Sequence, residues 1–247
     1  MKKYILLLLL VIILIPVIFS FAGDYGKERV YGMEKPEYIS LQLYKKETTH
    51  LVKLRDLGII YGWEFSYDRQ NRVITVYNEE SSFEIKIGEL DYGELKLEEA
   101  PFIKKGRTFI SLELVHLMVE EMDFEEQPEL LTGLSVEQKK VEPGDELKTE
   151  IIVYNIGPGQ VNLKYKSGQL YDLFLRQGEE EIWHWAEGKM FTMALQSRDL
   201  ESGAKLDYTE EIPFDSDLEE GQYTVTGEIA TDIPLELPEI DIAVVGQ

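Results

Sequence analysis

The sequence contains no cysteine and only three histidines among its 247 residues, and acidic side chains greatly outnumber basic ones. A chain without cysteine forms no disulfide, holds no zinc through thiolates and carries no lipid-modified cysteine. The histidines are isolated, and none lies at metal-ligand spacing from another; they are His50, His116 and His184. The sequence therefore predicts no metal-binding residue and a fold whose stability rests on packing.

The charge balance argues against one class of partner. There are 25 Lys and Arg residues against 47 Asp and Glu residues, which gives a formal net charge of −22 at pH 7. A surface of this sign repels the phosphates of nucleic acids and of anionic lipids. We expect no nucleic-acid partner, and we interpret the acidic excess as a solvated surface that keeps the chain soluble.

Motifs that carry catalysis are also absent. The sequence has no Gly-x-Ser-x-Gly nucleophile elbow and no glycine-rich phosphate-binding loop. The acidic runs at 179–181 and 215–217 lack the twelve-residue signature of a calcium loop, and we interpret them as solvated turns. We predict no catalytic residue, no cofactor and no cofactor-binding residue, so the protein is expected not to be an enzyme.

The N-terminus has the pattern of an export signal. Two lysines precede the apolar run Ile5–Phe19, and Ser20-Phe21-Ala22 supplies small residues before a candidate cleavage site. We predict residues 1–22 as a signal peptide and residues 23–37 as a tether. The alternative is an uncleaved anchor, because the 18 residues of Ile5–Ala22 lie at the lower limit for crossing a bilayer. Either way the remainder is expected outside the cytoplasm, secreted or attached to the cell envelope, with membrane contact only through an uncleaved N-terminal segment.

Residues 38–123 mix strand and helix patterns. Leu54 and Leu57 share one face of a short helix, which Gly62 is placed to end. Lys105-Gly106 is a tight-turn signal, and Ser111 is placed to cap a second helix. The strands expected around these helices are 38–43, the hairpin of 63–67 with 73–77, 83–87, and a short one at 95–97.

An internal repeat runs through this region. His50-Leu51-Val52-Lys53-Leu54 corresponds to Thr108-Phe109-Ile110-Ser111-Leu112, and each run leads from a short strand into a helix. The segment Gly106-Arg107-Thr108-Phe109-Ile110 resembles the doubled motif of copper amine oxidase N-terminal-like domains. That resemblance implies an α+β accessory module, common on bacterial envelope proteins, whose copper site belongs to another domain.

The chain changes character after an acidic segment with proline and glycine, which we predict as a linker over residues 124–133. From residue 134 to 247, short strands follow one another with turns between them. This spacing predicts an immunoglobulin-like antiparallel β-sandwich. The whole chain is thus expected to be mainly β, with a small α+β module at its N-terminal side and two modules that fold separately.

The densest pattern of the chain lies in this second region. Ser167-Gly168 is a turn signal that predicts a hairpin, and it leads to Tyr171-Asp172. Trp183 and Trp185 lie two residues apart, so a strand places both on one face, with at least one in the core. The pattern resembles the BsuPI-like intracellular proteinase inhibitor domains. Further matches are Asn155 at a strand end, Leu200-Glu201-Ser202-Gly203 and Gly221-Gln222-Tyr223.

The resemblance implies an inhibitor-like role, and two functions stay open. One is a module that presents a loop to a serine protease; the other is an envelope binding or scaffold protein that recognises another envelope protein or a wall component. The candidate contact residues lie in two predicted turns and are Ser167, Gly168, Glu187, Gly188 and Lys189. Lys189 offers a basic side chain to a trypsin-like pocket, and the alternative is that it keeps a turn soluble.

Overall fold

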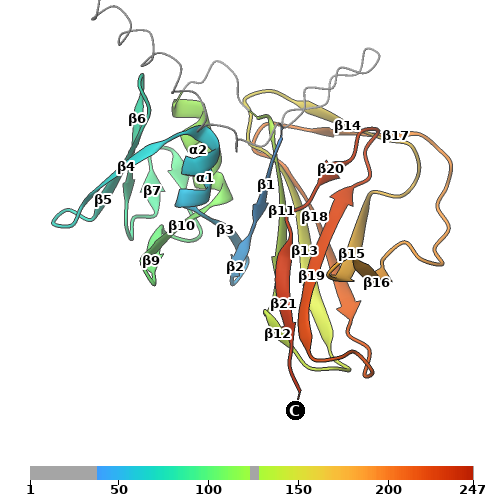
Figure 1. Ribbon diagram of the computed structural model, residues 1–247. Coiled ribbons are helices and arrows are strands. Elements are labelled where there is room, and N and C mark those ends of the chain that lie inside the picture. The colour runs from blue at the N-terminus through green and yellow to red at the C-terminus, as the bar shows by residue number, and fades with distance from the viewer. Residues whose placement is uncertain (1–37, 123–127, 247) are drawn as a thin grey trace, which may run out of the picture. The chain divides into compact units, whose positions relative to one another are not determined.

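The computed structural model describes residues 38–122 and 128–246 (Figure 1). The predicted signal peptide (1–22) and tether (23–37), together with residues 123–127 of the predicted linker, lie outside the described residues. No helix in the described ranges is long and apolar enough to cross a membrane. The described part of the chain is mainly β, with two helices, which confirms the predicted fold class.

The first module combines small sheets with both helices. Its elements are β2 (Tyr44–Lys46), β3 (Thr49–Lys53), α1 (Leu54–Tyr61), β4 (Glu64–Asp68), β5 (Val73–Tyr77), β6 (Ser82–Lys86), β7 (Asp91–Tyr92), β8 (Leu95–Lys96), β9 (Phe102–Lys104), β10 (Arg107–Ser111) and α2 (Leu112–Glu121). One sheet has the order β2-β3-β10-β9, a second joins β4, β5 and β6, and β7 pairs with β8. Figure 1 shows α1 and α2 beside these sheets.

The predicted repeat is present in the structure. Strand β3 leads directly into α1, β10 leads directly into α2, and the two strands pair antiparallel. Gly62 ends α1 in the left-handed conformation with a φ of 68°, and the Ser111 hydroxyl caps α2 by accepting a hydrogen bond from the Leu114 amide at 3.3 Å. Lys105 and Gly106 both have positive φ in the β9–β10 turn. Local signals therefore predicted this module well.

Two facing sheets and a ribbon make up the second module. Its strands are β1 (Tyr38–Gln42), β11 (Leu130–Val136), β12 (Lys140–Val141), β13 (Glu146–Asn155), β14 (Val161–Tyr165), β15 (Tyr171–Gln177), β16 (Glu180–His184), β17 (Gln196–Leu200), β18 (Lys205–Pro213), β19 (Gly221–Ile229), β20 (Leu235–Glu236) and β21 (Ile240–Val244). One sheet runs β1-β11-β13-β18, the other runs β12-β21-β19-β15-β16 with β20 beside β19, and β14 pairs with β17. Both sheets contribute to one buried cluster, for example through Ile151 and Leu173.

Strand β1 precedes the first module in sequence but pairs with the second. It runs parallel to β11, from Tyr38 opposite Leu130 to Gln42 opposite Leu134. Part of the predicted linker, Leu130–Gly133, therefore lies inside a sheet. Gly133 lets the Leu43 side chain pack against the strand, because a Cβ at this position would overlap that side chain.

The hairpin predicted at Ser167-Gly168 is wrong. Strand β14 before this turn pairs with β17, whereas β15 after it pairs with β16 and β19. The connecting residues 166–170 carry the chain from the ribbon to a different sheet. A turn signal marks a change of chain direction, but the pairing partner is selected by packing.

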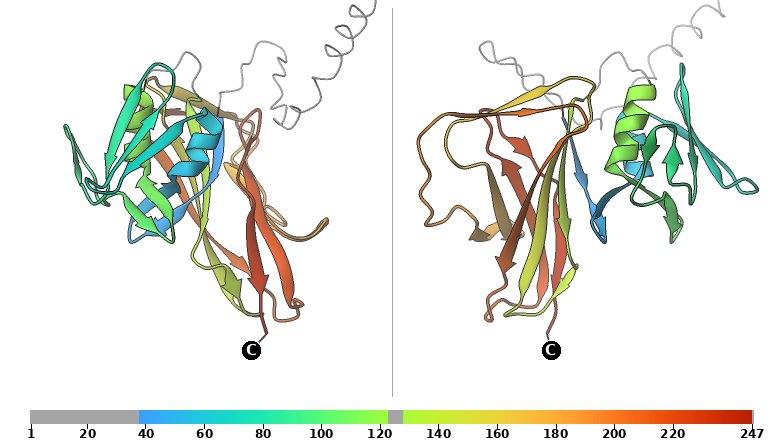
Figure 2. Two further views of the ribbon diagram at one scale, coloured as in Figure 1. Left: turned by 60° about the vertical axis from the view of Figure 1, so that its left-hand side comes forward. Right: turned by 180° about the vertical axis from the view of Figure 1, so that it is seen from behind.

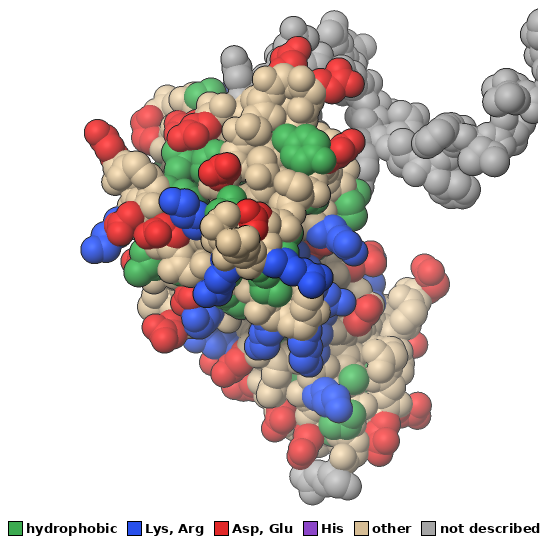
Figure 3. Space-filling model, turned by 90° about the vertical axis from the view of Figure 1, so that its left-hand side faces the viewer, with side chains coloured by type: hydrophobic (Ala, Val, Ile, Leu, Met, Phe, Trp, Pro, Cys, Tyr) green, Lys and Arg blue, Asp and Glu red, His purple; other side chains and the backbone are tan. Residues whose placement is uncertain are grey.

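Charged side chains are unevenly distributed over the surface. Figure 3 shows one face of the molecule, that of the first module, on which Lys and Arg side chains gather in a belt. Acidic side chains surround this belt. The net charge of −22 therefore conceals a local region of the opposite sign.

Candidate protein-binding loop

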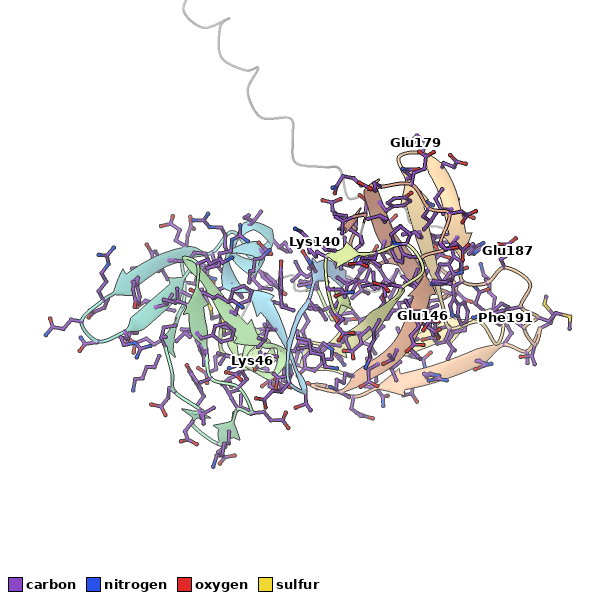
Figure 4. All side chains as sticks on the ribbon, turned by 90° about the horizontal axis from the view of Figure 1, so that it is seen from below. Lys46, Lys140, Glu146, Glu179, Glu187 and Phe191 are labelled. Carbon is purple, nitrogen blue, oxygen red and sulfur yellow. The ribbon has the colours of Figure 1, made fainter. Side chains whose placement is uncertain are left out.

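The most exposed apolar side chains of the described chain lie in the connection between β16 and β17. This loop, residues 185–195, stands away from the sheets when the molecule is seen from behind (Figure 2). Met190 is 98 % exposed, Met193 is 88 % exposed and Leu195 is 81 % exposed. In Figure 4, Glu187 and Phe191 label the loop, and a sulfur atom marks its outer end. Large apolar groups held in water are typical of binding surfaces.

An aromatic cluster anchors the base of the loop. Trp185 packs against the core of the second module, and its ring lies 4.5 Å from that of Tyr171 and 5.8 Å from that of Phe191. Tyr171 in turn lies 4.8 Å from Tyr208 and hydrogen-bonds to the Glu210 carboxylate. Burial raises the pKa of the Tyr171 phenol above its usual value, as does the adjacent carboxylate. The phenol therefore stays neutral and donates to Glu210.

Backbone hydrogen bonds shape the first half of the loop. The Glu187 amide donates to the His184 carbonyl at 3.1 Å, and the Lys189 amide donates to the Ala186 carbonyl at 3.0 Å. Gly188 has a φ of 70°, a conformation that favours glycine. Two successive turns thus bring Met190 to the exposed end of the loop.

The second half of the loop is tied to the other predicted contact segment. The Gly168 amide donates to the Thr192 carbonyl at 2.8 Å, and a Cβ on Gly168 would lie only 2.6 Å from the Thr192 hydroxyl oxygen. The neighbouring Ser167 hydroxyl accepts from the Gln169 amide at 3.1 Å and so holds the turn. The structure brings the two predicted segments together, although the turn supports the loop and is itself only partly exposed.

A buried carboxylate fixes the strand from which the loop starts. Asp172 is 5 % exposed and accepts hydrogen bonds from the Gln169 side chain at 2.8 Å and the Leu173 amide at 2.9 Å. His184 Nε2 lies 2.7 Å from the same carboxylate. Burial raises the pKa of the neighbouring Glu228, and the charge of Asp172 raises it further. Because a carboxylate only accepts hydrogen bonds, the His184 imidazole is the donor in this contact.

Lys189 is exposed, but its charged end rests on an aromatic ring of the loop. Its ammonium lies 3.4 Å from the centre of the Trp185 ring, a cation–π contact that draws the charge back onto the aromatic cluster. Met190, which directly follows, is the most exposed of the large apolar side chains in the loop. Sequence reasoning missed it because an apolar residue beside Phe191 has the same local pattern as a core strand.

Other positions of the sequence pattern have structural roles. The buried Asn155 side chain donates to the carbonyls of Gly159 at 2.7 Å and Leu200 at 2.8 Å, and it accepts from the Gly157 amide at 3.0 Å. It joins two turns at one end of the module. Trp183 and Trp185 are both partly buried and pack against the same core cluster without belonging to its buried members.

Two family models match separate parts of the chain. Residues 134–233 match the model of the intracellular proteinase inhibitor family BsuPI, and residues 33–124 match that of the copper amine oxidase N-terminal domain. Both resemblances are confirmed. The two matches follow each other in the predicted order, and neither model describes a catalytic domain.

Comparisons with whole proteins add little. No curated protein matches the chain. Among solved structures, the sporulation control protein Spo0M of Bacillus subtilis has a TM-score of 0.31 at 12 % identity, covering 48 % of this chain and 49 % of that one. A β-glucosidase of Listeria innocua in complex with glucose has a TM-score of 0.29 at 13 % identity, covering 49 % of this chain and 17 % of that one. The CARDB domain of PF1109 from Pyrococcus furiosus has a TM-score of 0.29 at 15 % identity, covering 47 % of this chain and 94 % of that one. Scores this low support no functional argument.

Proposed function

We propose that this chain is an exported, non-enzymatic protein whose second module binds and inhibits a serine protease through the 185–195 loop. The BsuPI match supports an inhibitor-like role, and the N-terminal sequence pattern supports export. The observation that carries the proposal is the exposure of Met190 at the end of a loop that is tied at several points.

The loop suits a protease cleft because contacts within the free protein already hold it in place, which lowers the entropic cost of binding. An inhibitor loses affinity when its contact segment must be ordered on binding. Here the Trp185–Phe191 contact and the Gly168–Thr192 hydrogen bond hold the segment on either side of Met190. The remaining exposed apolar side chains, Met193 and Leu195, extend the surface that would be buried.

The positions of Lys189 and Met190 indicate which class of protease the loop would fit. A trypsin-like pocket needs a free basic side chain, whereas an apolar pocket accepts an unbranched apolar one. Lys189 is drawn onto Trp185, and Met190 is free in solvent. The preferred target is therefore a protease with an apolar specificity pocket, such as a subtilisin-like enzyme.

The test uses the full chain, purified in the form that the cell exports, against a subtilisin-like and a trypsin-like protease. We expect inhibition of the subtilisin-like enzyme at micromolar concentration or below, with a weaker effect on the trypsin-like enzyme. If both enzymes keep full activity, or degrade the loop without delay, the inhibitor proposal fails. An envelope binding or scaffold function would then explain the exposed loop better.

A further inference from the structure

Three basic residues of the first module gather at one end of the β9–β10 hairpin. Lys104 and Arg107 lie opposite each other across the strand pair, and Lys105 occupies the turn between them. All three side chains are exposed. Among the described residues, none of them has a carboxylate within ion-pair distance. They leave a concentration of unpaired positive charge on a strongly acidic chain.

An aromatic floor lies on the same face of the sheet. Residues two apart on a strand share a face, so Phe102 and Phe109 lie alongside Lys104 and Arg107. The rings of Phe102 and Phe109 stack at 5.3 Å, and the Tyr44 ring meets Phe109 edge-on at 5.2 Å. Phe102 and Tyr44 remain partly exposed. The floor therefore offers apolar contact area next to the cations.

Further lysines border this floor. The Lys46 ammonium lies 5.1 Å from the centre of the Phe102 ring, and that of Lys53 lies 4.7 Å from the centre of the Tyr44 ring. Glu99 neutralises Lys46 at 2.6 Å, and Asp56 approaches Lys53 at 3.7 Å. The aliphatic parts of Lys46 and Lys53 pack on the aromatic rings. Because both ammonium groups lie near carboxylates, they attract an anion less strongly than the hairpin cations do.

Lys139, a residue of the second module, lies near Tyr44. Its ammonium lies 3.5 Å from the Gln42 side-chain oxygen, which also accepts a hydrogen bond from the Tyr44 hydroxyl at 3.0 Å. The residues that we define as the basic face are Tyr44, Lys53, Phe102, Lys104, Lys105, Arg107, Phe109 and Lys139. Figure 4 labels Lys46, which lies over the Phe102 ring, and Lys140, which directly follows Lys139.

We propose that the basic face binds an acidic polysaccharide chain, with sugar rings against the aromatic floor and carboxylates on the hairpin cations. The net charge of −22 decides against broad anionic partners such as a bilayer or a second copy of this chain, because both bring negative charge against the acidic surroundings. A single narrow polymer chain can lie along the face, where acidic side chains farther away than the Debye length of about 8 Å at physiological salt repel it little. This inference concerns a different module from the protease proposal, and either can fail alone.

The test measures binding of the full chain to polygalacturonate by calorimetry, with its methyl-esterified form and inorganic polyphosphate as comparison polymers. We expect binding of polygalacturonate that weakens as salt rises, with the neutral ester and polyphosphate each bound roughly tenfold more weakly or not at all. Equal binding of polyphosphate would overturn the sugar contact, and equal binding of the ester would overturn the charge contact. Binding only to anionic vesicles or to single-stranded DNA would overturn the proposal.

Paired charge reversals locate the site. Lys104→Glu with Arg107→Glu is expected to weaken polygalacturonate binding roughly tenfold or more. The control, Arg69→Glu with Lys86→Glu, makes the same change in net charge on exposed residues of the β4-β5-β6 region. If both double variants weaken binding equally, net charge alone is responsible and the basic face is not the site. Unchanged thermal unfolding of the variants shows that loss of binding is not loss of fold.

Discussion

At the scale of single residues, the most consequential polar contact joins the two modules. His50 in β3 is 8 % exposed, and its Nε2 lies 2.8 Å from the Glu150 carboxylate in β13. The Lys45 ammonium bonds the other oxygen of the same carboxylate. Burial lowers the pKa of His50, and hydrogen bonds from Lys45 and His50 lower that of Glu150 although its burial acts in the opposite direction. His50 is therefore neutral and donates from Nε2.

The lowered pKa values of His50 and Glu150 predict that the folded protein loses stability in acid. Because the folded-state pKa of His50 lies below its usual 6.5, the unfolded chain takes up a proton first as the pH falls through that value. Glu150 adds a further loss below its usual 4.5. We expect the Tm of the native chain to fall more steeply between pH 7.5 and 5.5 than that of His50→Gln, whose amide can still donate to Glu150. Parallel pH profiles measured by circular dichroism would contradict this assignment.

At the scale of elements, the close pairing of β15 and β19 depends on one glycine. A Cβ at Gly227 would overlap the backbone carbonyl oxygen of Asp172, which cannot move without breaking the strand pair. We expect Gly227→Ala to lower the free energy of unfolding by about 3 kcal/mol in urea denaturation. Gly159→Ala is the control, since nothing lies within 4 Å of its Cβ position, and its effect should stay within about 0.5 kcal/mol. Equal effects would show that the close approach is not rigid.

Elements defined by local signals could be predicted from the sequence, and those defined by distant partners could not. The Ser111 cap, the Gly62 helix end and the Lys105-Gly106 turn follow from neighbouring residues alone. The parallel pairing of β1 with β11 joins segments about 90 residues apart, and no short pattern specifies its register. The exposure of Met190 could not be predicted either, because an apolar residue beside Phe191 has the same local pattern as a buried strand.

At the scale of the whole molecule, the two modules share buried structure. The core cluster of the first module includes Leu131 from β11 and Ile152 and Tyr154 from β13. The described chain from residue 38 onward belongs to one compact unit. Separate folding of 38–122 and 134–247, which the polar linker suggests, would break β1–β11 pairing and expose these side chains.

We therefore expect a single unfolding transition for the full chain. Calorimetry should give one peak, with both modules melting together, because two-state behaviour follows when a core is shared. A fragment of residues 134–247 lacks β1 and the first half of β11, and it should unfold at a lower temperature than the full chain. Two well-separated peaks, or a fragment as stable as the full chain, would show that the modules are independent.

The central claim is that the exposed end of the 185–195 loop enters a protease. It is tested most directly by the inhibition constant of the full chain against a subtilisin-like protease, measured for Met190→Asp beside Ile59→Asp. Ile59 is a matched control, since it is an apolar residue of the first module with 76 % exposure. We expect Met190→Asp to raise the inhibition constant by roughly 30-fold or more, the effect typical of a central contact residue, while Ile59→Asp leaves it unchanged. Equal constants for the native chain and Met190→Asp would contradict the claim.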